Sequence, residues 1–242
     1  TEAMAYLARV QQESGEKVTI THLVGAAVAR ALAKAPGLNG RILFGRYIPH
    51  DTVDIAFLVS LDGGKNLAKA KVRSLDKKSV IDVARELREL AGRLRSGEDD
   101  SFKKSMGPIK LLPTWLIRPL LWATGWLASS LGLSAKAFGV ERFPFGSCII
   151  TSVGMFGLDE GWAPPTPFAR VPVYVLLGAV RQRPAVIDGE IKIREELTLC
   201  ATIDHRFLDG FQGGILAKEV KRLLESPEEL NKPVPLQVSS SD

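Results

Sequence analysis

The first half of the chain repeats apolar residues with a helical period. Residues 2–12 are predicted as a helix, and a second helix capped by Thr21 is predicted to run to Pro36-Gly37. The strongest pattern opens at Ser79, which forms a capping-box-like pair with Asp82. Its apolar face consists of Val80, Val83, Ala84, Leu87, Leu90, Ala91 and Leu94. A last helix is predicted over residues 212–224.

Short β-branched stretches follow a different period and predict strands. The first, at residues 53–60, precedes an Asp62-Gly63-Gly64 turn. The others are expected at residues 147–152, 171–180, 190–193 and 197–203. The chain shows no internal repeat and no linker, so we expect one α+β domain over residues 1–232. The Pro- and Ser-rich stretch from residue 226 onward, including the tail 233–242, is expected to be loose.

Residues 111–133 break the pattern, because Arg118 is their only charged residue and they hold three of the four tryptophans. On a helix, Trp115, Trp122 and Trp126 line up beside a narrow stripe that contains Arg118. Three interpretations stand: contact with protein, contact with a membrane surface, or a membrane span. Two prolines and Arg118 argue against the span. We expect these tryptophans to pack against another subunit and to help set an assembly larger than a trimer.

Composition narrows the class of protein. The chain has 242 residues, of which 45% are hydrophobic and 24% charged, which excludes a disordered or collagen-like chain. The net charge of +5 is spread without a run of five like charges, which argues against nucleic acid as a partner. Cys148 and Cys200 lie in apolar stretches and are expected to be buried thiols, as in a reducing cytoplasm.

Candidate chemistry rests on few residues. Of the three histidines, His22 at a helix start and His50 in a polar loop are interpreted as surface or capping residues. His205 differs, because it follows an apolar strand, precedes a helix and lies between Asp204 and Asp209. Near neutral pH such an imidazole can accept a proton, although a structural salt-bridge network is the alternative. The sequence shows no metal-ligand spacing, nucleophile elbow, Walker loop or dinucleotide fingerprint.

Four stretches together resemble one family. Residues 204–210 match the His-x-x-x-Asp-Gly signature of the chloramphenicol acetyltransferase-like superfamily, in the Asp-His-Arg form of the dihydrolipoamide acyltransferases. Residues 150–157, residues 72–79 and the pair 183–186 with 188–191 resemble further stretches of those enzymes, in the same order. The resemblance covers most of residues 1–106 and 146–232.

The resemblance implies a two-layer α+β fold, with a mixed sheet and helices on one side, that works as a trimer. In that family the active site lies between subunits. Carried over, the catalytic set is His205 as general base, Thr151 of the neighbouring chain as hydroxyl donor to the oxyanion, and Asp209, which holds the loop through an arginine. Asp204 and Arg206 belong to the structural motif, and Gly210 would permit a tight exit into the helix.

The implied reaction moves a short acyl group between the thiols of coenzyme A and a lipoyl group carried on a separate domain or protein, without a metal. A base is needed because a thiol is mostly protonated at neutral pH. The chain departs from the family in an apolar insertion at residues 107–145, in the stretch 65–71, and in a first strand that would precede Thr1. Two alternatives stay open: a stand-alone coenzyme A-dependent acyltransferase with a hydroxyl or amine acceptor, and a catalytically silent trimer-based cage.

Overall fold

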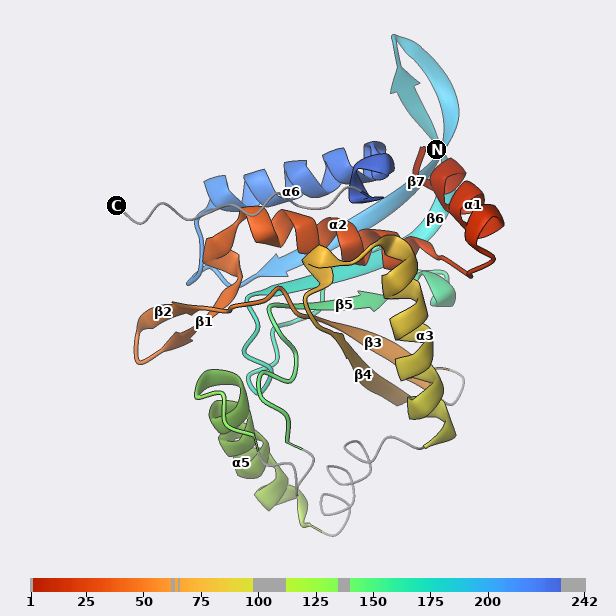
Figure 1. Cartoon of the computed structure of the whole chain (residues 1–242). Coiled ribbons are helices and arrows are strands. Elements are labelled where there is room, and N and C mark those ends of the chain that lie inside the picture. The colour runs from red at the N-terminus through yellow and green to blue at the C-terminus, as the bar shows by residue number, and fades with distance from the viewer. Residues whose placement is uncertain (1, 62–63, 65, 98–111, 135–139, 232–242) are drawn as a thin grey trace.

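A five-stranded mixed sheet forms the centre of the computed structural model, which describes residues 2–61, 64, 66–97, 112–134 and 140–231 (Figure 1). Its strands run in the order β4-β3-β5-β6-β7. β5 is parallel to both neighbours, and the two outer pairs are antiparallel. The strands are β3 (Ile55–Leu61), β4 (Asn66–Val72), β5 (Cys148–Ser152), β6 (Val173–Ile187) and β7 (Glu190–Ile203).

Four helices cover one face of this sheet: α1 (Glu2–Ser14), α2 (Ile20–Lys34), α3 (Val80–Ser96) and α6 (Gly210–Glu225). α2 and α6 lie side by side across it (Figure 1). Apolar residues of all four helices form a single core with the sheet, in which Leu23, Ile55 and Leu177 are fully buried. The predicted α+β class, with helices on one side of a mixed sheet, is therefore confirmed.

The predicted helices appear, with ends that are shifted by up to two residues. The capping box of α3 is complete, because Ser79 and Asp82 bond each other's backbone N–H groups. α2 begins two residues earlier than predicted, and its N-cap is Thr19 rather than Thr21. His22 explains the shift, because its Nδ1 accepts a hydrogen bond from the Thr19 backbone N–H at 3.1 Å.

The strand predictions need four corrections, one of which is that β6 continues seven residues past its predicted end at Val180. The stretches 190–193 and 197–203 are one continuous strand, β7, which pairs with β6 through a tight turn at Asp188 and Gly189, both with positive φ. The hairpin of β1 (Gly40–Leu43) and β2 (Arg46–Pro49) was not predicted. β4 was also missed, although its buried Ala68, Ala70 and Val72 alternate with polar positions.

Part of the stretch expected to be loose is ordered. A 3-10 helix spans Pro227–Asn231, Pro227 and Leu230 are buried, and the Tyr6 hydroxyl donates to the Asn231 side chain at 2.7 Å. These contacts pack residues 227–231 against α1. The predicted tail at 233–242 lies outside the described residues.

The apolar insertion forms a separate helix, α5 (Thr114–Gly125), which continues into a π-helical turn at Trp126–Ser130. Figure 1 shows α5 beside the body, away from the helical layer, near the β1–β2 hairpin. The end of this segment is anchored by hydrogen bonds: Ser129 Oγ donates to the Phe168 carbonyl, and Arg41 Nε donates to the Ser130 carbonyl. No helix in the described part of the chain is long and apolar enough to cross a bilayer.

Candidate active site

His205 lies in a tight turn between β7 and α6. The turn is fixed by its two neighbours, because the Asp204 carboxylate accepts hydrogen bonds from the backbone N–H and from the guanidinium of Arg206, the shortest at 2.6 Å. Arg206 also lowers the pKa of Asp204. The Phe207 N–H closes the turn on the Asp204 carbonyl at 3.0 Å. The result is an exposed imidazole on a rigid turn.

Asp209 has a structural contact of its own. Its carboxylate accepts a hydrogen bond at 3.0 Å from the Gln212 N–H and so caps α6. The two aspartates that flank His205 in the sequence are thus both engaged elsewhere. The prediction that a tight exit into the helix requires glycine at position 210 is not supported within the single chain. The φ of Gly210 is not in the left-handed region, and an added Cβ would meet nothing within 4 Å.

Thr151 lies on β5, half-buried, opposite Leu176 of β6. Side chains alternate along a strand, so Thr151 shares a face with Ile149, which belongs to a second, smaller apolar cluster with Tyr174. That face is the one away from the four helices, which contact Cys148 and Ile150. The hydroxyl therefore points to the side of the sheet that the helical layer leaves open.

His205 and Thr151 are far apart within the chain. Thr151 on β5 pairs with Leu176 on β6, and Leu176 pairs with Cys200 on β7. Cys200 lies five residues before His205 in the sequence. At a rise of about 3.3 Å per residue and a spacing of about 4.8 Å between strands, the two side chains are separated by roughly 16 Å along the strands and roughly 10 Å across them. One copy of the chain cannot place both groups on the same substrate atom.

Two glycines fix the turn that follows Thr151. A Cβ at Gly154 would lie 2.6 Å from the Gly178 carbonyl oxygen, and a Cβ at Gly178 would lie 1.8 Å from that of Asp159. Such close backbone contact leaves room for glycine alone. Asp159 also bonds Arg181 and Arg183 on β6, at 2.8 Å and 2.9 Å. These contacts hold the end of β5 in one position.

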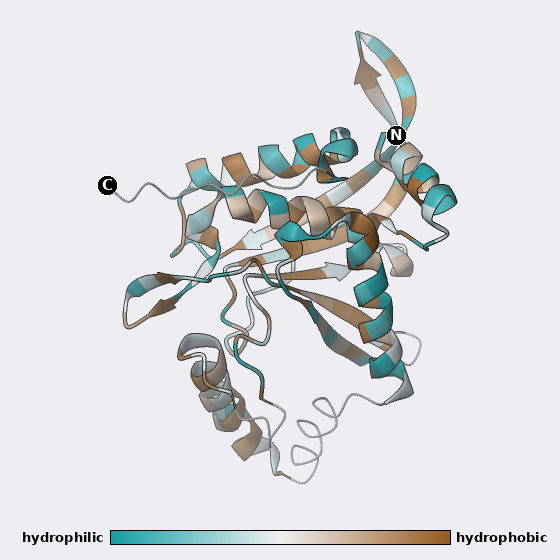
Figure 2. Cartoon of the chain, in the orientation of Figure 1, coloured by the Kyte–Doolittle hydropathy of each residue, from teal (hydrophilic) through white to brown (hydrophobic). Residues whose placement is uncertain are grey.

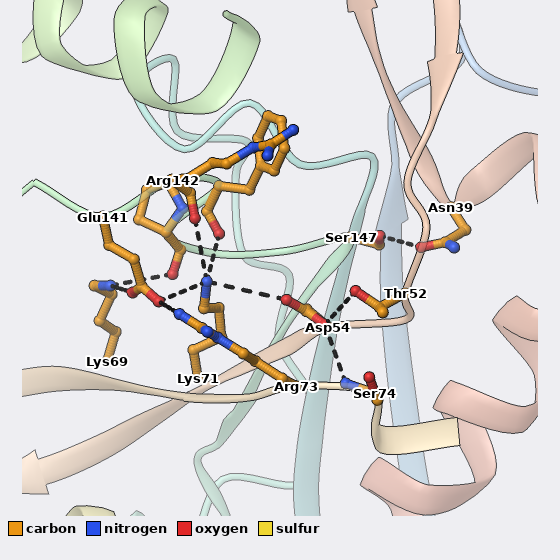
Figure 3. Close-up of polar contacts among 12 residues, drawn as sticks. Asn39, Thr52, Asp54, Lys69, Lys71, Arg73, Ser74, Glu141, Arg142 and Ser147 are labelled. Carbon is orange, nitrogen blue, oxygen red and sulfur yellow. Dashed lines mark hydrogen bonds and ion pairs between the residues drawn. The ribbon is translucent and has the colours of Figure 1, made fainter. Parts of the chain in front are cut away.

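A second polar region was not predicted. A cavity of about 380 Å³ opens between the end of β2, the end of β4 and the segment 142–146, and among its lining residues are Arg41, His50, Asp54, Lys71 and Arg142. Its wall is a cluster of ion pairs on Glu141, which bonds Lys69, Lys71 and Arg73 at 3.0, 2.8 and 2.7 Å (Figure 3). The alternate basic residues of β4 were the available sequence signal, but Glu141 lies some 70 positions away.

Charge compensation in this cluster is strong. Burial by itself would raise the pKa of Glu141, but the neighbouring Lys69, Lys71 and Arg73 lower it to about 2. Burial lowers the pKa of Lys71, whose ammonium also donates to the Arg142 and Phe143 carbonyls. Because each buried charge has a partner, the cluster fastens the segment after α5 to the sheet.

His50 departs from its predicted place on the surface. Its ring is partly buried against Phe143, at 4.7 Å between centroids, and burial and then Arg41 lower its pKa to about 4. Burial likewise lowers the pKa of the capping residue His22 to about 4. Both are neutral near pH 7. Cys148 and Cys200 are buried free thiols, as predicted.

No group of three or more His, Cys, Asp or Glu side chains within the described ranges could hold a metal ion. The described groups that could act on a substrate are His205, Thr151 and the side chains that line the polar cavity. Of these, His205 combines exposure with a fixed backbone.

The chain matches a family model described as "2-oxoacid dehydrogenases acyltransferase (catalytic domain)" over residues 1–101 and 134–231. The stretch 102–133, which contains α5, lies between the two matched segments. Both His205 and Thr151 fall within the matched part.

Among curated proteins, the chain is 25% identical to a mitochondrial dihydrolipoyllysine-residue succinyltransferase component of the 2-oxoglutarate dehydrogenase complex of Saccharomyces cerevisiae, over 93% of this chain and 39% of the relative. It is 28% identical to acetyltransferase components of the pyruvate dehydrogenase complex of Staphylococcus epidermidis and of the acetoin cleaving system of Bacillus subtilis, covering 90% and 91% of this chain. The chain spans only 41% and 44% of those two relatives.

Solved structures share the fold. A probable dihydrolipoamide acetyltransferase from Listeria monocytogenes superposes with a TM-score of 0.70 at 24% identity, covering 97% of this chain and 84% of that one. The Azotobacter vinelandii dihydrolipoamide acetyltransferase gives 0.68 at 22%, covering 95% and 79%. A chloramphenicol acetyltransferase gives 0.50 at 13%, covering 90% and 82%.

Proposed function

This chain belongs to the 2-oxoacid dehydrogenases acyltransferase (catalytic domain) family, and from that premise we propose that it transfers an acyl group between the thiols of coenzyme A and a lipoyl group. The observation that carries the proposal is the exposed His205 on a turn held by the Asp204–Arg206 pair. An imidazole that is fixed in place but open to solvent can meet a thiol brought by a mobile carrier.

The proposed reaction needs one base and one hydrogen-bond donor. His205 takes the proton of the incoming thiol, and the thiolate attacks the carbonyl carbon of the bound thioester. The resulting tetrahedral oxyanion accepts a hydrogen bond from the Thr151 hydroxyl. Collapse breaks the old carbon–sulfur bond, and the departing thiolate recovers the proton from His205.

The separation of the two residues supports a shared site. His205 and Thr151 lie at opposite ends of the central strands, so a complete site takes His205 from one copy and Thr151 from another. We propose a homotrimer, and on it a larger cage, because relatives are named as components of multienzyme complexes. The fold also resembles the solved cubic core of a pyruvate dehydrogenase multienzyme complex, with a TM-score of 0.65 at 21% identity. The two free thiols fit a reducing cytoplasm.

The activity is tested with purified chain, acetyl- or succinyl-coenzyme A, and dihydrolipoamide. We expect thiol-to-thiol transfer that is lost in His205→Ala, with an unchanged circular dichroism spectrum. Transfer to a hydroxyl or amine acceptor but not to dihydrolipoamide would favour the stand-alone acyltransferase. No transfer to any acceptor by well-folded particles would favour the silent cage.

Complementation tests the shared site directly. His205→Ala and Thr151→Ala chains are each expected to be inactive alone. In randomly mixed particles, half of the chains have an intact His205 and the other half have an intact Thr151, so about one quarter of the interfaces combine the two. Co-expression should therefore restore roughly one quarter of the activity of the unchanged protein. If mixed particles form and stay as inactive as the parents, the two residues do not act across an interface.

A further inference from the structure

We propose that α5 docks on the surface of an anionic phospholipid bilayer. The docking surface is a tryptophan stripe made of Trp115, Trp122 and Trp126, extended by Phe44 at the tip of the β1–β2 hairpin. Trp115, Trp122 and Phe44 are 76%, 57% and 81% exposed, and Phe44 meets Trp126 edge to face at 6.3 Å between centroids. The stripe is therefore one continuous apolar surface built from two elements.

The body of the protein does not cover this surface. α5 buries only Gly125, whose backbone lies against Phe168, while Leu120 and Leu121 of α5 and Leu127 of the π-helical turn are 38%, 37% and 40% exposed. Figure 2 shows the apolar colouring of α5 apart from the helical layer. An exposed apolar surface of this kind marks an interaction site.

The charged residues of the elements that carry the stripe indicate the kind of partner. The described elements that carry the stripe are residues 114–130 and the β1–β2 hairpin at 40–49, and their charged residues are Arg41, Arg46 and Arg118, with no Asp or Glu. The two elements that carry the stripe are therefore basic. A basic apolar helix is attracted by anionic lipid headgroups.

Two arginines lie beside the tryptophans of the stripe. Arg118 is exposed one turn from both Trp115 and Trp122, and the Arg170 guanidinium lies 5.8 Å from the Trp122 ring centroid. Tryptophan beside arginine suits the headgroup layer, where the ring stays partly apolar and the cation meets phosphate.

The helix is suited to lie on a bilayer rather than to cross it. Its 12 residues extend about 18 Å, well short of the roughly 30 Å hydrocarbon core. A second copy of the chain fits less well, because a two-fold contact through the stripe would bring Arg41, Arg46 and Arg118 of one copy towards the same three arginines of the other. The contact between subunits expected from the sequence is thus the competing outcome of the test.

The test is sedimentation of the full chain with vesicles, and it does not depend on acyl transfer. One vesicle preparation contains equal parts of phosphatidylglycerol and phosphatidylcholine, and the other contains phosphatidylcholine alone. We expect binding to the anionic vesicles only, weakened at high salt because screening shortens the reach of the charges. Trp115→Ser/Trp122→Ser should lower the partition constant about tenfold or more, and Arg118→Glu roughly tenfold at low salt.

Trp162→Ser is the matched control, because it removes the fourth tryptophan, which is 66% exposed in the segment that leads to β6. It should leave vesicle binding unchanged. Absence of binding by the unchanged chain, or equal loss in the control, would overturn the proposal. If the double variant instead forms smaller particles by light scattering without lipid, the stripe joins subunits and the lipid assignment is wrong.

Discussion

Apolar side chains are buried in the sheet and its helical layer but exposed in the α5 segment. In the body, Leu23, Val24 and Ile55 are completely buried, and the helices and strands cover each other. In α5, the largest apolar side chains face outward, and the attachment is made by a few polar contacts at its end. The body can therefore account for its own stability, while the α5 segment needs a surface from outside the chain.

This contrast also separates the proposed functions. The groups proposed for chemistry, His205 and Thr151, lie at the ends of strands in the body, where neighbouring elements fix the backbone. The α5 segment contributes neither of them, and the stretch 102–133 falls between the two matched parts of the family model. Variants in the body should thus change chemistry or folding, whereas variants in the exposed stripe should change docking.

The largest expected effect is on turnover. His205→Ala should lower the rate of thiol-to-thiol transfer by about 10²–10⁴-fold, because a positioned base contributes that much. Unfolding by urea should be unchanged, since the His205 side chain is exposed. Activity within about tenfold of the unchanged chain would refute the assignment of the base.

The second effect concerns the hydroxyl on β5. Thr151→Val keeps the shape of the side chain and removes the donor, so kcat should fall by about 10²–10³-fold with little change in KM. Thr151→Ser should restore much of the rate. Ser152→Ala is the control, because the next side chain on the strand points to the other face. A raised KM at constant kcat would instead make Thr151 a binding or packing residue.

The third effect tests how the α5 segment is fastened to the body. Glu141→Gln leaves Lys71, whose side chain is 5% exposed, without its closest carboxylate, and should cost about 1–3 kcal/mol of unfolding free energy at pH 7. The pKa of Glu141 is lowered to about 2, so its stabilisation is complete above the unfolded value and is lost as the pH falls from about 4.5 towards 2. The difference between variant and unchanged chain should shrink over that window in urea titrations.

A matched control is available at an exposed pair. Glu190 bonds Lys192 at 3.0 Å, but its side chain is 72% exposed, so Glu190→Gln should change stability by less than about 0.5 kcal/mol. Equal effects of the two substitutions would show that the Glu141 cluster does not hold the segment.

Local signals explain what could be predicted from the sequence. The apolar face of α3 and its Ser79–Asp82 pair lie within one stretch, so the helix and its start were both predictable. The β1–β2 hairpin has only four residues in each strand, too few for a period to show. The Glu141 cluster joins positions about 70 residues apart, and a site shared between copies leaves no trace in the spacing of a single chain. His205 could be proposed from the sequence because its motif is continuous there.

The smallest expected effect concerns the N-terminal cap of α3, which belongs to the body and is determined by neighbouring residues in the sequence. Ser79→Ala removes the Oγ that accepts the Asp82 N–H at 3.2 Å and leaves one N-terminal donor of α3 to water. Since capping serine residues contribute about 1 kcal/mol, the unfolding free energy should fall by about that amount, and vesicle binding by α5 should not change. Ser79→Asp keeps an acceptor at the cap and should recover most of the loss. Ser96→Ala at the other end of the helix is the control, and a loss as large as that of Ser79→Ala would mean that the cap has no special role.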